Sequence, residues 1–104
     1  MPVPSRHVDH VLVSLHDATL IRVCVEWEAG VCVVVARRSP EKGGEVVIEV
    51  TGMRRLECPH HLPWGPSSSI NTARCTTNGT EVLLEVEVQS GDVILIEGAA
   101  IRLD

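Results

Sequence analysis

The chain has 104 residues, of which 44% are hydrophobic and 22% are charged, and its formal net charge is −5. That length fits one domain, residues 1–104, and the composition is typical of an ordinary globular protein rather than a disordered one. No apolar run approaches the ~20 residues that span a bilayer, and the first residues lack the apolar region of a signal peptide. We therefore expect a single folded domain in the cytoplasm that does not act at a membrane.

The basic residues are few and scattered along the chain. There is one lysine and there are eight arginines, and the adjacent pairs are Arg37 with Arg38 and Arg54 with Arg55. A domain that binds nucleic acid usually gathers its basic residues on one face. The sequence therefore predicts no nucleic-acid partner.

Four cysteines without a secretory signal indicate a reducing compartment and free thiols. Cys24 and Cys32 each lie between two valines, where a thiol packs as a small hydrophobic group. We predict that all four cysteines are reduced and that none binds a metal.

Hydrophobic residues recur with a period of two, which is typical of strands. Seventeen residues are valine, and branched aliphatic side chains favour the pleated surface of a sheet. The alternation and the turn residues between the runs predict strands over residues 8–15, 20–28, 31–38, 45–56, 70–77, 80–89 and 93–103, the last with a bend at Gly98. The predicted fold class is all-β, an antiparallel sandwich or half-open barrel of about seven strands with little or no helix.

The first strong hairpin signal joins residues 20–28 to residues 31–38. A two-residue turn at Ala29 and Gly30 would pair Trp27 with Cys32. In that register Trp27 lies on the apolar strand face, so we expect it in the core. Cys24 and Cys32 then lie on opposite faces, which argues against a disulfide between them.

Turn residues mark most of the other connections. Residues 39–44 form a polar loop, and Asn78 with Gly79 is typical of a type I′ hairpin. Residues 57–69 contain three prolines and no alternation, so we predict one long irregular loop there. Loops of this length within a compact domain are uncommon and often functional.

The histidines and cysteines give little support for a metal site. Cysteine and histidine are zinc ligands, and the candidates are Cys58, His60 and His61, with His7, His10 and His16 near the start of the chain. Structural zinc sites usually show paired ligands at C-x-x-C or H-x3-H spacing, and neither spacing occurs. We therefore predict no metal site and no cofactor.

Catalysis is also weakly supported. A nucleophilic cysteine needs a lowered pKa and a base within hydrogen-bond reach, and nothing local supplies either. The conceivable pairs are Cys58 or Cys75 with His16 or His61. We therefore predict that the protein is not an enzyme. Of the three functions considered, enzyme ranks after a protein-binding module and a small-ligand-binding protein.

Two stretches are candidates for a binding site. One is the pair His16 and Asp17, for which the structural interpretation is an ordinary turn. The other is the proline-rich loop around Trp64, which as a structural element would plug one end of the sandwich. An aromatic loop anchor also suits an interface, so the predicted binding residues are His16, Asp17, Trp64, Gly65, Ser67 and Asn71.

Three segments together resemble a known family. They are Leu-His-Asp-Ala-Thr-Leu (15–20), Pro-Trp-Gly-Pro-Ser-Ser-Ser-Ile-Asn (63–71) and Gln-Ser-Gly-Asp-Val-Ile (89–94). In this order they resemble a family of small bacterial all-β proteins of unknown function. That family is itself similar to the immunity protein 50 type of polymorphic-toxin immunity proteins. The resemblance implies a compact cytoplasmic β-protein and, for the toxin-immunity branch, binding of a toxin domain. It brings no catalytic residues.

The sequence thus favours a non-enzymatic protein-binding module whose partner is another protein, such as a toxin domain. An acidic face of Glu81, Glu85 and Glu87 could steer a basic partner. The alternative is a small-ligand-binding β-protein with a pocket under the Trp64 loop. We also predict a homodimer or higher oligomer, because a strand at residues 7–15 would leave an apolar edge exposed.

Overall fold

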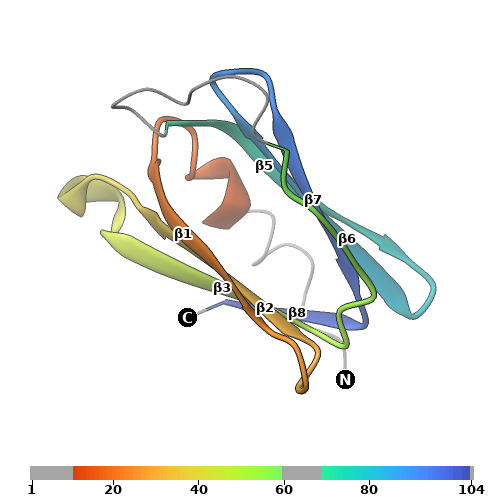
Figure 1. Ribbon diagram of the computed structural model, residues 1–104. Coiled ribbons are helices and arrows are strands. Elements are labelled where there is room, and N and C mark those ends of the chain that lie inside the picture. The colour runs from red at the N-terminus through yellow and green to blue at the C-terminus, as the bar shows by residue number, and fades with distance from the viewer. Residues whose placement is uncertain (1–10, 60–68, 104) are drawn as a thin grey trace.

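The computed structural model describes residues 11–59 and 69–103, which form two antiparallel four-stranded sheets packed face to face (Figure 1). The first sheet has the order β1-β2-β3-β8 and the second has the order β4-β7-β6-β5. The strands are β1 (Thr19–Glu26), β2 (Val31–Arg37), β3 (Glu45–Thr51), β4 (Arg55–Glu57), β5 (Ile70–Asn78), β6 (Glu81–Val88), β7 (Val93–Gly98) and β8 (Ala100–Leu103). The predicted all-β antiparallel sandwich is confirmed. Within the described ranges no helix is long and apolar enough to cross a membrane.

The core lies between the sheets and follows the alternation along each strand. In β6 every second residue is buried, and in β3 the inward residues are Val46, Ile48 and Val50. The buried core cluster contains aliphatic side chains and one thiol, Cys32. Branched aliphatic side chains fill such a thin interior well because they pack closely on pleated strands.

The chain passes from one sheet to the other at Gly52 and again at Gly98, two glycines that lie side by side in the fold. β3 belongs to the first sheet and β4 to the second, so the predicted single strand over residues 45–56 is wrong and splits at Gly52. Gly52 has a φ of +62°, which favours glycine. The chain returns after Gly98, and the Ala99 N–H donates to the Thr51 carbonyl oxygen at 2.8 Å. The two crossovers therefore form one corner of the sandwich.

The predicted strand at residues 8–15 is wrong in its described part. Residues 11–13 are helical, and the Leu15 N–H donates to the Leu12 carbonyl oxygen at 3.1 Å. Leu12 and Leu15 are buried while Val13 is 74% exposed, which is helical spacing. In Figure 1 this turn, drawn in red, lies between the two sheets at one end of the sandwich. Burial against both sheets outweighs the β preference of its valines.

The register of the first hairpin also differs from the prediction. Val25 pairs with Cys32 and Glu26 with Val31, so residues 27–30 form a four-residue turn instead of a two-residue one. Trp27 therefore lies in the turn and is 85% exposed, which contradicts its predicted place in the core. Cys24 is exposed and Cys32 is buried, so the prediction that they face opposite sides is confirmed.

Candidate functional site

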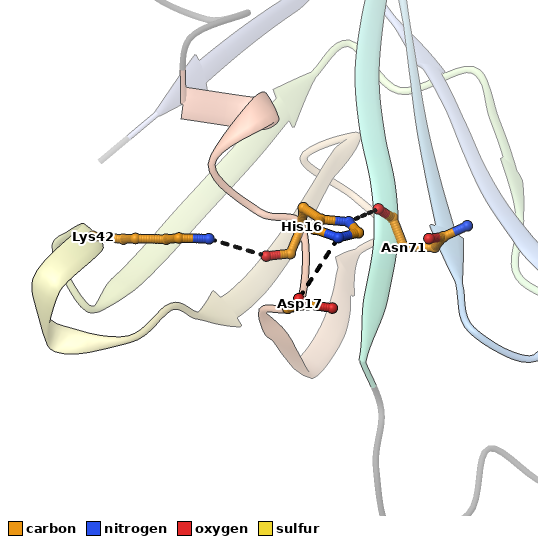
Figure 2. A network of polar contacts seen from close by, with 4 residues as sticks. All are labelled: His16, Asp17, Lys42 and Asn71. Carbon is orange, nitrogen blue, oxygen red and sulfur yellow. Dashed lines mark hydrogen bonds and ion pairs between the residues drawn. The ribbon is translucent and has the colours of Figure 1, made fainter.

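Three of the predicted binding residues lie together where the N-terminal turn meets β5 (Figure 2). The His16 ring nitrogen Nδ1 lies 2.7 Å from the Asn71 carbonyl oxygen. A carbonyl oxygen only accepts, so Nδ1 carries the proton and donates. The other ring nitrogen, Nε2, lies 3.6 Å from Asp17 Oδ2, and both side chains are largely exposed.

Backbone contacts explain why His16 and Asp17 sit there. The Asp17 N–H donates to the Ile70 carbonyl oxygen at 2.8 Å, and the Ile70 N–H donates to the Ala18 carbonyl oxygen at 2.7 Å. Asp17 has a φ of 68°, in the left-handed region that aspartate tolerates better than most residues. These backbone hydrogen bonds attach the turn to the start of β5. His16 and Asp17 therefore have a structural role in this turn, as the turn interpretation of the sequence predicts.

A second set of contacts ties the same turn to the loop between β2 and β3. Lys42 Nζ donates to the His16 carbonyl oxygen at 3.4 Å, as Figure 2 shows. Arg38 Nη1 donates to Ser14 Oγ at 2.9 Å, and Arg38 Nε donates to the Gly44 carbonyl oxygen at 3.2 Å. The hollow between them holds about 150 Å³, which is small for an organic ligand.

The remaining predicted site residues, Trp64, Gly65 and Ser67, lie outside the described residues. His60 and His61, like His7 and His10, also lie outside them. Within residues 11–59 and 69–103 there is no group of three or more metal-ligating side chains.

Two of the thiols, Cys32 and Cys58, are in environments that favour the protonated form. Burial, with smaller contributions from Cys58 and Cys24, raises the pKa of Cys32 to about 11. Burial also raises the pKa of Cys58, one of the two cysteines considered as a nucleophile. A thiol whose pKa is raised is a weaker nucleophile at neutral pH, because the thiolate is the reactive form.

A larger hollow lies beside the first hairpin, and its residues were not predicted as a site. We call it the Trp27 groove. It holds about 520 Å³, and its residues are Val25, Trp27, Met53, Arg54, Arg55 and Leu56, with Gly30 at the turn. The Met53 N–H donates to the Gly30 carbonyl oxygen at 2.7 Å, which holds the hairpin beside the start of β4. The groove therefore joins the edge strands of the two sheets.

The groove combines an apolar lining with a neutralised rim. Trp27 is 85% exposed and Val25 is 38% exposed, so two apolar side chains of the lining lie open to solvent next to each other. Arg54 forms an ion pair with Glu81, and Arg55 forms one with Glu57. No motif marks this site in the sequence, because its exposure depends on the length of one turn.

The predicted acidic face exists, but other side chains partly neutralise it. Glu81, Glu85 and Glu87 lie at alternate positions of β6 and share the outer face of the second sheet. Arg74 Nε lies 3.2 Å from Glu85 Oε1, and Asn71 Nδ2 donates to Glu87 Oε1 at 3.2 Å. Arg54, which pairs with Glu81, and Arg74 thus offset two of the three carboxylates, whereas the neutral Asn71 leaves the charge of Glu87 in place.

No protein-family model and no curated protein matches the chain. Among solved structures, the chain is similar to an uncharacterized protein from Neisseria gonorrhoeae, with a TM-score of 0.65 and 10% sequence identity. The match covers 86% of this chain and 91% of that chain. At this identity the similarity shows a shared fold and carries no information about function.

Proposed function

We propose that the protein is a non-enzymatic module that binds another protein through the Trp27 groove. The observation that supports this most directly is the 85% exposure of Trp27 above an open apolar hollow. Tryptophan is enriched among residues that dominate binding energy, and it does so by filling or closing apolar pockets. A partner that covers Trp27 would therefore explain why this large apolar side chain is exposed in the free protein.

The lining of the groove indicates what kind of side chain would enter it. Arg54 and Arg55 are already paired with glutamates, so the rim adds little net charge. Val25, Met53 and Leu56 offer apolar contacts, which fit an aliphatic or aromatic side chain of the partner. The net charge of −5 favours a basic partner at long range.

The resemblance to the immunity protein 50 type supports a toxin domain as this partner. A protein of that type would bind its toxin and block it without performing chemistry. His16 and Asp17 are proposed as a second contact.

Capture from the source cell tests this function. Immobilised wild-type protein should retain one stoichiometric partner, and Trp27→Ala should lose it. The matched control is Val13→Ala, which truncates another exposed apolar side chain away from the groove and should leave capture unchanged. Co-expression of the captured protein should then show whether it is a toxin that this chain neutralises. Equal capture by wild type and Trp27→Ala would place the interface elsewhere.

A small apolar ligand is the second candidate, because a volume of about 520 Å³ falls in the range of small-molecule sites. A ligand that binds only the folded state raises the melting temperature by mass action. A thermal-shift screen of small molecules separates the two functions. A hit that Trp27→Ala abolishes would favour the small-ligand function over the protein partner.

A further inference from the structure

The outer edge of β1 is open along most of its length. β1 is the terminal strand of the first sheet, and its first residue, Thr19, bridges to Ser69, which directly precedes β5. Beyond that bridge, four of the five residues from Arg22 to Glu26 are exposed, and the fifth, Val23, is half-buried. Edge strands are commonly protected by charged side chains, proline or a bulge. Here a bulge lies between Leu20 and Arg22, and the two charged residues of the stretch after it, Arg22 and Glu26, have opposite signs.

The exposed stretch is self-complementary when it is read in opposite directions. Its sequence is Arg-Val-Cys-Val-Glu, residues 22–26. An antiparallel pair with its two-fold axis at Cys24 sets Arg22 opposite Glu26 of the second copy and Val23 opposite Val25. We propose that two copies of this chain associate through β1 in this register and join their first sheets into one eight-stranded sheet.

Charge complementarity supports a second copy of this chain as the partner of the β1 edge. Arg22, Cys24 and Glu26 share the outer face, and on β2 their neighbours are Val35, Val33 and Val31. Among the described residues, neither Arg22 nor Glu26 forms an ion pair within the chain. The two-fold register gives both of them opposite charges as cross-strand neighbours, twice per dimer. It also sets Val23 of the second copy opposite Val25, so the pair adds an apolar cross-strand contact.

The ladder between the two β1 strands is short, so we expect the dimer to have a low affinity. Five residues pair, because the bulge ends the regular ladder on one side and the turn ends it on the other. An interface this small belongs to the weak, reversible class. The association should therefore depend on protein concentration and should be trapped readily by a covalent link.

Charge reversal tests the register. In sedimentation over a range of concentrations, the wild type should pass from an 11.3 kDa monomer to a dimer. Arg22→Glu should remain monomeric, because it sets two glutamates opposite each other at both ends of the ladder. The double variant Arg22→Glu with Glu26→Arg should dimerise again. A monomeric wild type at every concentration, or a dimer that Arg22→Glu leaves intact, would overturn the proposal.

The native thiol offers an independent test of the same register. Directly opposite residues of an antiparallel pair have Cα atoms about 4.5–5.5 Å apart, within the range of disulfides. Diamide, which accepts the two electrons and two protons that the thiols lose, should link two Cys24 side chains. The linked dimer should vanish in Cys24→Ser and persist in Cys58→Ser, which removes another exposed thiol. Linkage through Cys58 alone would contradict the register.

The dimer and the proposed function can fail separately. Trp27→Ala should leave sedimentation and the Cys24 link unchanged, and the dimer is wrong if this variant is monomeric while Arg22→Glu is not. Circular dichroism of each variant shows that it is folded before its association is measured.

Discussion

Replacing Trp27 by alanine should separate binding from folding. The side chain is 85% exposed, so about 15% of its surface is buried. For a side chain of about 250 Å² this is roughly 40 Å², which at ~25 cal/mol per Å² amounts to about 1 kcal/mol. That figure is an upper bound, because the unfolded chain already buries some of this surface. Trp27→Ala should therefore lower the free energy of unfolding by about 1 kcal/mol or less.

The same substitution should weaken partner binding by about 2 kcal/mol or more, as truncation of an interface anchor does. Leu84→Ala is the opposite case, because Leu84 is fully buried between the sheets. It should cost about 2–5 kcal/mol of stability through the cavity it leaves. Binding per folded molecule should be unchanged in Leu84→Ala.

Urea unfolding followed by far-UV circular dichroism measures the stability of these variants. Tryptophan fluorescence is unsuitable as the probe, because Trp27 is one of the two tryptophans and the substitution removes it. Titration calorimetry with the captured partner measures binding. A loss of stability in Trp27→Ala as large as that in Leu84→Ala, with binding intact, would refute the assignment of Trp27 to an interface.

Three further predictions concern the scaffold. Gly98→Ala should lower the free energy of unfolding by about 1–3 kcal/mol in urea titrations, because the added Cβ would lie 2.5 Å from Val50 Cγ1 and 2.8 Å from a backbone oxygen. Stability should fall as the pH rises between 9.0 and about 11, since the unfolded Cys32 thiol loses its proton before the folded one does. Cys32→Ala should flatten this part of the profile, and an unchanged slope would contradict it. Asp17→Gly should leave the melting temperature unchanged or raise it, whereas Asp17→Val should lower stability by about 1–2 kcal/mol, because φ at this position is 68°.

The sequence alone determined the strands whose two faces differ in chemistry. In β6 valine and leucine alternate with glutamate except at Leu83, and such a strand buries the face without glutamate, so its orientation follows from local order. A hairpin was also predicted at Asn78 and Gly79, and one forms there, but Asn78 pairs with Glu81, so the turn residues are Gly79 and Thr80. Only Gly79 has a positive φ, 65°, so the predicted type I′ turn is wrong, and glycine at the first turn position is typical of type II′. The meeting of His16 with Asn71 was anticipated only as part of a wider site, and the structure shows that contact directly.

The tertiary structure decided the features that depend on what lies opposite a segment. Leu12 and Leu15 are compatible with a strand or a helix, and the open end of the sandwich, which needs a cap, selects the helical turn. Trp27 fits the alternation of β1, but the turn begins at Trp27, two residues earlier than predicted, and carries this side chain beyond the core. A shift of this kind leaves the local pattern of apolar residues unchanged. Only the position of the second sheet distinguishes a tryptophan in the core from one at a groove, because burial is a property of the packed layers.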